Sequence, residues 1–236
     1  MLFHDNLDTH VRFEQERLAR LHQANIPEVG VILAVLGPNE DQDARANPGG
    51  HSVTRPVERL ALNSHGIEGD RHAGLTRSST GRESALYRTD RVRITNRRQI
   101  FAVSPADCDV LSQRLEVEAT PQLLGANLVI GREDGESFSL SSVPMNTYFV
   151  IASAGGAEMP CPPIATLVHY VQQQGCSRTG KAFARAYGDD SLVKRFVTHS
   201  RDHRGILCAV EYPADSVVYL EAGQRVFFKF AMGRCP

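Results

Sequence analysis

Short apolar runs rich in β-branched residues dominate this chain, and each run ends at a turn signal. Runs of roughly four to eight such residues between Gly, Pro, Asn or Asp are typical of β-strands. The sequence carries them at residues 29–36, 57–63, 99–103, 124–130, 148–152, 204–210 and 224–230. Many short strands with interspersed helices favour a mainly β fold with a barrel-like core and flanking helices. A chain of 236 residues can bury such a core without covalent or metal cross-links.

Helix signals lie between and before these runs. Residues 9–24 place apolar side chains on one face, and Ser104-Pro105 has the residue types of a helix N-cap and first helical position. Pro160-Cys161-Pro162-Pro163 is expected to open a further helix, because the apolar positions after it fit the helical spacing. Residues 180–198 are expected to hold one or two more helices. We therefore expect a helical extension over 1–27 and a single domain over 28–236.

Bulk composition excludes several classes of partner. The net charge is −1, so the whole-chain balance indicates neither a nucleic acid nor a membrane partner. The five cysteines are irregularly spaced without a CxxC pair, which argues against a zinc ribbon or a disulfide framework and favours a reducing compartment. The first residues lack the basic and apolar runs of a signal peptide. The expected location is cytoplasmic, and the oligomeric state stays open.

One polar stretch stands out against this neutral background. The run from Gly66 to Gly74, GIEGDRHAG, places three glycines among two acids, Arg71 and His72. Ten arginines against five acids lie between His51 and Arg98, an excess that suits an anionic ligand. A solvated surface turn is an equally good interpretation of the loop alone. Nucleic acid is a weaker one, because Tyr87 is the single aromatic residue among these charges.

Cys161 is the cysteine with the most suggestive setting. It lies between prolines at the expected start of a helix, where amide groups and the helix dipole favour the thiolate. A thiolate binds soft metals or attacks electrophiles. The alternative is a buried, unreactive cysteine, which is the common fate of free cysteine and our interpretation of Cys108, Cys176, Cys208 and Cys235.

Two polar residues could also contact a ligand. Asn127 follows Gly125 at the mouth of an apolar strand, and Ser104 lies at a helix start, where anions bind. Each also has an ordinary structural role: Asn127 as a turn residue and Ser104 as a helix cap.

Taken together, these pieces resemble the MOSC domain, named for the C-terminus of molybdenum-cofactor sulfurases. The family includes bacterial proteins of resistance to N-hydroxylated bases and the mitochondrial amidoxime-reducing component. The resemblance spans roughly residues 28–230 and rests on GIEGDRHAG at 66–74, NRRQIFAVS at 96–104, LGANLVI at 124–130, Pro160-Cys161, RGILCAV at 204–210 and the closing Gly223-Gln224-Arg225-Val226. This chain has Ala126 and Gln224 where the family commonly has Glu and Asp.

The resemblance implies a barrel-like MOSC domain, similar to the pyruvate-kinase β-barrel, that binds a molybdenum-molybdopterin cofactor and not pyridoxal phosphate. Cys161 would hold the metal. Arg71, Arg98, Ser104 and Asn127 match positions that contact the pterin or its phosphate, and His72 is a candidate proton donor.

Three functions follow as hypotheses. The first is a molybdenum-dependent oxidoreductase that reduces small N-hydroxylated substrates. Because the chain has no ferredoxin-like cysteine set, its electrons would come from a separate donor protein. The second is a sulfur carrier or cofactor-handling module without turnover. The third is a non-catalytic module that binds anions or nucleic acid through the arginine-rich loop.

Overall fold

A computed structural model describes residues 29–39, 53–79, 91–155 and 162–230. The expected helix at 9–24 lies outside these residues. So do Cys161 and Cys235, so the predicted setting of Cys161 stays a prediction.

Seven strands form a closed barrel, which confirms the predicted fold class. They are β1 (Val29–Pro38), β7 (Ile100–Val103), β8 (Leu128–Gly131), β9 (Thr147–Ala152), β10 (Ala165–Gln172), β11 (Ile206–Tyr212) and β13 (Arg225–Phe230). Their order is β13-β9-β10-β11-β7-β8-β1, and pairing of β1 with β13 closes the ring. Only β7 and β8 pair in parallel among these neighbours. The short strand β2 (Thr54–Pro56) continues the sheet beside β1.

The barrel strands separate two hydrophobic cores. Along β7, Ile100 and Ala102 join the core inside the barrel, whereas Phe101 and Val103 join the core beneath the helices. Side chains alternate between the two faces of a strand, so a strand covered on both faces is apolar throughout. This explains why the sequence shows continuous apolar runs at these strands.

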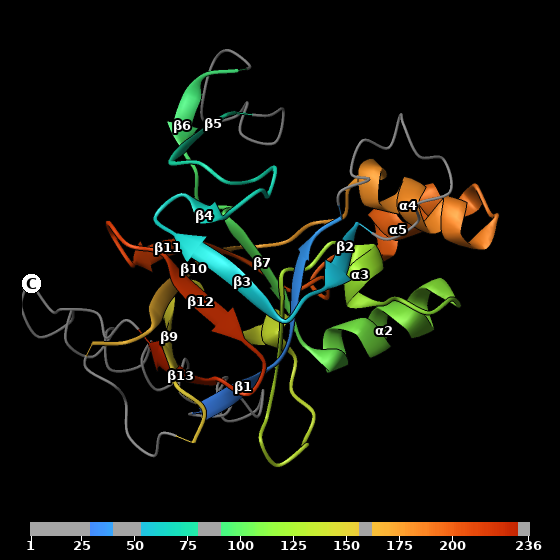
Figure 1. The fold of residues 1–236 in the computed structure, drawn as a ribbon. Coiled ribbons are helices and arrows are strands. Elements are labelled where there is room, and N and C mark those ends of the chain that lie inside the picture. Colours follow the sequence, from blue (N-terminus) through green and yellow to red (C-terminus); the bar gives the residue numbers. More distant parts are fainter. Residues whose placement is uncertain (1–28, 40–52, 80–90, 156–161, 231–236) are drawn as a thin grey trace, which may run out of the picture.

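The helices cover one side of the barrel (Figure 1). They are α2 (Pro105–Leu115), α3 (Pro121–Leu124), α4 (Ser177–Tyr187) and α5 (Ser191–His199), and a 3₁₀ turn lies at Leu140–Ser142. Ser104 caps α2 as predicted, and its side chain accepts a hydrogen bond from the Asp107 amide. The prediction of one or two helices over 180–198 is confirmed by α4 and α5, although α4 begins earlier, at Ser177. None of the described helices is long and apolar enough to span a membrane.

Two small sheets complete the described structure. One contains β3 (Arg59–Asn63), β4 (Gly66–Ile67) and β12 (Val218–Glu221). The other is the hairpin of β5 (Thr76–Ser78) and β6 (Arg93–Thr95), which projects from the barrel (Figure 1). Strands β4, β5 and β6 arise from the polar stretch 65–96, in which the sequence shows no hydrophobic period, whereas β3 precedes it and β12 comes from near the end of the described chain.

The predicted helix after Pro163 is wrong. Residues Ala165–Gln172 form strand β10, which pairs with β9 and β11. The apolar positions fit a helical spacing by coincidence, because a short apolar run fits both periods. Hydrogen-bonded pairing with β9 on one side and β11 on the other stabilises the strand conformation of these residues. The predicted strand at 124–130 is also shorter than expected, because Leu124 ends α3 and Gly125 forms its left-handed C-cap.

Candidate functional site

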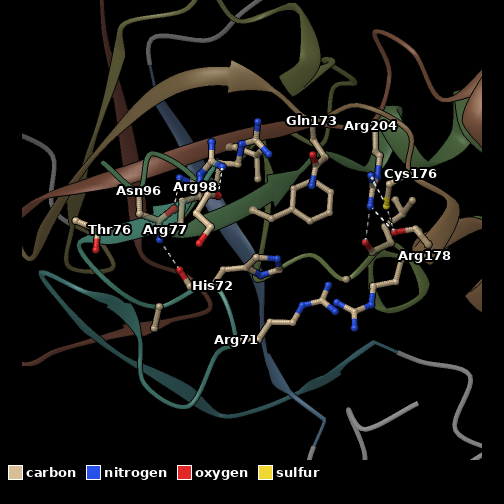
Figure 2. A pocket seen from close by; sticks show the side chains of 17 residues that line it. Arg71, His72, Thr76, Arg77, Asn96, Arg98, Gln173, Cys176, Arg178 and Arg204 are labelled. Atoms are coloured by element: carbon tan, nitrogen blue, oxygen red, sulfur yellow. Dashed lines mark hydrogen bonds between the residues drawn. The ribbon is translucent and has the colours of Figure 1, made fainter. Parts of the chain in front are cut away.

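A cavity of about 790 Å³ lies between the glycine-rich loop, the β5–β6 hairpin and the start of α4 (Figure 2). Among its described lining residues are five arginines, one histidine and one cysteine, but no carboxylate. The arginines are Arg71, Arg77, Arg98, Arg178 and Arg204. Such a lining concentrates positive charge and suits an anionic ligand with several oxygen atoms.

The glycine-rich loop places consecutive side chains on opposite sides. Asp70 points inward and is almost fully buried, whereas Arg71 and His72 line the cavity. Gly69, immediately before them, has a φ of +75°, a left-handed conformation that glycine adopts without strain. The predicted use of glycine for unusual backbone conformations is confirmed, and the loop contributes to a cavity wall.

Asp70 is the centre of a hydrogen-bond network beneath this wall. Its Oδ1 accepts hydrogen bonds from the His72 amide at 2.7 Å and the His72 ring Nδ1 at 3.1 Å, and its Oδ2 accepts one from Asn127 at 3.0 Å. Burial alone would raise the pKa of Asp70, but the hydrogen bonds and charge of His72, with help from Asn127, hold it below its ordinary value. The carboxylate is therefore ionised near neutral pH.

Cys176 lies at the N-cap position of α4, inside the cavity wall. Its Sγ is 3.3 Å from the Thr179 hydroxyl and 3.6 Å from a guanidinium nitrogen of Arg204. Burial opposes ionisation, but the charge of Arg204 and the hydrogen bonds from Thr179 outweigh it and lower the pKa of Cys176 to about 7. A substantial fraction of this thiol is thus thiolate at neutral pH.

Arg204 is a buried guanidinium, and only 3% of its surface is exposed. It donates hydrogen bonds to the Gln174 carbonyl and the Thr179 hydroxyl, and it lies over the rings of Phe101 and Phe196 at 5.5 and 5.1 Å. These contacts fix its charge beside Cys176. A buried charge needs an opposite charge or several hydrogen bonds, and Cys176 thiolate supplies negative charge here.

The structure brings together some of the predicted site residues and not others. Arg71, His72 and Arg98 all line the cavity. Ser104 and Asn127 are buried and are not among its lining residues. Ser104 caps α2, while Asn127 accepts a hydrogen bond from the Phe101 amide and donates one to Asp70. Asn127 therefore links strand β7 to Asp70 of the glycine-rich loop and does not contact the cavity.

Sequence reasoning missed four residues of this site: Asp70, Cys176, Arg178 and Arg204. Cys176 was interpreted as a buried, unreactive cysteine because the next helix was expected to start at residue 180, four residues later. With the start at Ser177, the segment Gly175-Cys176-Ser177-Arg178-Thr179 would have shown a thiol at a helix N-cap. No sequence signal joins Arg204 to Cys176, because 28 residues separate them.

The other described cysteines lack this environment. Burial, followed by nearby Asp107 and Asp109, raises the pKa of Cys108 to about 12, and burial raises that of Cys208 further. The described part of the chain contains no group of three His, Cys, Asp or Glu side chains that could hold a metal ion.

The fold and the cavity together define a β-barrel protein with a basic, thiolate-bearing pocket. Comparison with known proteins shows which family the chain belongs to. The sequence pattern of the MOSC domain matches residues 89–227. The chain is 31% identical over 163 residues to a Bacillus subtilis protein named "Putative metal-sulfur cluster biosynthesis proteins YuaD", covering 68% of this chain and 77% of that one. The chain belongs to the MOSC domain family.

The barrel is also similar to a solved structure. The crystal structure of YuaD from Bacillus subtilis superimposes with a TM-score of 0.64 at 24% identity. The match covers 84% of this chain and 94% of YuaD, so the two share a fold over most of their lengths.

Proposed function

We propose that this protein binds a molybdenum-pterin cofactor in the arginine-lined cavity, with Cys176 as the protein's thiolate ligand. The observation that carries the proposal is the coincidence, in one cavity, of a thiol with a lowered pKa and five guanidinium groups, with no carboxylate among the described lining residues. Thiolate is a soft donor suited to such a metal, and guanidinium groups suit a phosphate. When bound, the cofactor would supply a metal centre that exchanges oxygen and electrons.

This assignment replaces Cys161 with Cys176 as the first candidate. The case for Cys161 rested on the resemblance of Pro160-Cys161 to the family pattern and on an expected helix start; the resemblance stands untested, whereas a strand follows at Ala165–Gln172 in place of the helix. The helix-start thiolate occurs at Cys176. Since Cys161 lies outside the described residues, the experiment below tests both cysteines.

The remaining side chains have separate roles in this proposal. Arg98 and Arg77, on the side of the cavity lined by Asn96 and Thr76 (Figure 2), are suited to the pterin's terminal phosphate. His72 presents its ring to the cavity and would transfer protons to bound substrate. Asp70 orients that ring.

Two activities are compatible with such a site. In the first, the protein is an oxidoreductase of small N-hydroxylated compounds and receives electrons from a separate donor protein. In the second, Cys176 carries sulfur as a persulfide or the protein hands on its cofactor, which agrees with the metal-sulfur biosynthesis role in the name of YuaD. A nucleic-acid site is less favoured, because Phe101 is the single aromatic residue among the described lining residues.

Metal and pterin analysis tests cofactor binding. The wild type and the variants Cys176→Ala, Cys161→Ala and Cys208→Ala are purified from a molybdate-supplied host, and molybdenum and pterin are measured per folded chain. We expect about one molybdenum per chain in the wild type and loss only in Cys176→Ala. Retention by Cys176→Ala with loss in Cys161→Ala would transfer the ligand role to Cys161. A wild type without metal or pterin would refute the proposal.

A second measurement separates the two activities. The loaded protein is assayed for reduction of an N-hydroxylated base with a chemical electron donor, and the mass of the protein as isolated is measured in parallel. Reduction that disappears in Cys176→Ala supports the oxidoreductase. A mass increase of one sulfur atom on the Cys176 peptide, without reduction, supports the carrier.

A further inference from the structure

Arg71 and Arg178 are two arginines of the cavity wall that lie close enough for their charges to repel each other. Arg71 and Arg178 make no hydrogen bond or ion pair within the described residues, although each lies in a polar cavity wall. Figure 2 shows their guanidinium ends directed toward each other. Like charges held together without a carboxylate between them indicate a place for an anion.

Among the described residues, the contacts of the neighbouring acid explain why no carboxylate lies between the two arginines. The carboxylate of Asp70, the acid next to Arg71 in sequence, is directed instead to His72 and Asn127. Partial desolvation at the cavity wall, and then the charge of Arg178, lower the pKa of Arg71, while Asp70 and Cys176 act in the opposite direction. The guanidinium remains ionised, and the repulsion from Arg178 remains for a ligand to relieve.

The position of Arg178 places this pair near the reactive thiol. Arg178 lies two residues after Cys176, in the first turn of α4. Arg77 and Arg98 lie on the other side of His72 in the cavity (Figure 2). The cavity therefore contains two basic regions, and only one of them adjoins Cys176.

We infer that Arg71 and Arg178 form an oxyanion-binding subsite beside Cys176, and that the substrate taken there is a small anion with a carboxylate or tetrahedral oxyanion group. The assignment of a substrate to this subsite rests on the proposed function. The binding of an anion by Arg71 and Arg178 does not depend on the cofactor. It narrows the substrate class, because a neutral N-hydroxylated base would leave the two charges unpaired.

The first test uses metal-free protein and two alkylating agents of similar size. Iodoacetate is an anion and iodoacetamide is neutral, and either one transfers its carbon to the Cys176 thiolate with release of iodide. Rates are measured by mass spectrometry of the Cys176 peptide. We expect the ratio of iodoacetate to iodoacetamide rates to exceed that of 2-mercaptoethanol by about tenfold, since hydrogen bonds to charged groups are strong. Inorganic sulfate should suppress this preference.

Matched variants locate the effect. Arg71→Gln and Arg178→Gln should each lower the ratio at least about threefold. Arg201→Gln removes the same charge from an exposed side chain outside the cavity lining and should leave the ratio unchanged. Circular dichroism checks that the variants fold. The inference is overturned if the wild-type ratio equals that of 2-mercaptoethanol, or if Arg201→Gln lowers it as much as the cavity variants.

The second test asks whether the subsite serves substrate or the phosphate of the cofactor. Binding of inorganic sulfate is measured by titration calorimetry on metal-free and molybdenum-loaded protein. Binding retained in the loaded protein, and lost in Arg178→Gln, supports a substrate subsite. Binding lost on loading overturns the substrate assignment. A protein that never carries molybdenum but shows the alkylation preference would refute the proposed function and leave the anion subsite standing.

Discussion

The Asp70 carboxylate lies 3.1 Å from Nδ1 of His72 and fixes how the histidine ring meets the cavity. Because an ionised carboxylate only accepts hydrogen bonds, Nδ1 of His72 must carry the proton. When the ring carries a single proton, that proton is on Nδ1, and Nε2, which faces away from Asp70, carries none. The buried carboxylate thus selects Nε2 as the ring nitrogen that can exchange a proton with a ligand.

Replacement of Asp70 by Asn should disturb this selection without removing the side chain's volume. We expect ¹⁵N NMR of His72 to show the Nδ1-protonated form in the wild type and a mixture of both forms in Asp70→Asn. Asp134→Asn is a matched control on an exposed acid. An unchanged His72 spectrum in Asp70→Asn would contradict the orienting role.

The same substitution should change how stability depends on pH. The pKa of Asp70 is lower in the folded protein than its ordinary value, so its stabilising effect is present above that ordinary value and is lost as pH falls through the folded pKa. Urea unfolding should therefore show Asp70→Asn less stable than the wild type at pH 7, with a difference that shrinks in acid. A constant difference from pH 7 to pH 3 would argue against an ionised Asp70.

Alkylation of Cys176 should report the influence of Arg204. The reaction with neutral iodoacetamide should reach half its maximal rate near pH 7, because the thiolate reacts and the pKa of Cys176 is about 7. Cys108 and Cys208 should stay unmodified in the folded protein, because burial raises the pKa of each. Arg204→Met should shift the half-maximal rate of Cys176 to higher pH.

Arg204→Lys is the control for that shift, since it keeps the charge but not the planar fork that reaches Thr179 and Gln174. We expect a smaller shift in Arg204→Lys than in Arg204→Met. Equal profiles in all three proteins would show that Arg204 does not set the reactivity of Cys176.

Substitution of Ser104 separates a structural role from ligand contact. The Ser104 hydroxyl oxygen accepts hydrogen bonds from the amides of Asp107 and Leu140, both inside the fold. Ser104→Ala should cost about 2 kcal/mol of unfolding free energy, through loss of the cap and an unsatisfied amide. Molybdenum per folded chain should stay at the wild-type level. Loss of metal at unchanged stability would instead support the ligand contact expected from the sequence.

Gly180 tests how α4, which carries Cys176 and Arg178, is held in place. A Cβ added at Gly180 would lie 2.8 Å from the carbonyl oxygen of Val193 in α5. Alanine normally stabilises a helix relative to glycine, but this contact is with backbone and cannot relax cheaply. Gly180→Ala should therefore lower the unfolding free energy by about 1–3 kcal/mol. Lys181→Ala, at the next and exposed position, should change it little.

The strands and helix ends are the part of the structure that local sequence determines best. Apolar β-branched runs predicted six of the seven barrel strands at their approximate positions, and Ser104-Pro105 marked the start of α2. The exception is β10, whose residues fit both a helical and a strand pattern. Pairing with β9 and β11 favours the strand over the helix, and these two strands come from segments before and after β10 in the chain.

By itself, the sequence determined the barrel class and the basic character of the glycine-rich loop, because hydrophobic period, turn residues and charge are local properties. The family followed from the resemblance of short sequence motifs. Only the tertiary structure decided which residues share the cavity. Arg204 reaches Cys176, and Asn127 reaches Asp70 across 57 positions of sequence. The ionisation of a thiol depends on charges within a few ångströms in space, and separation along the chain does not report those distances.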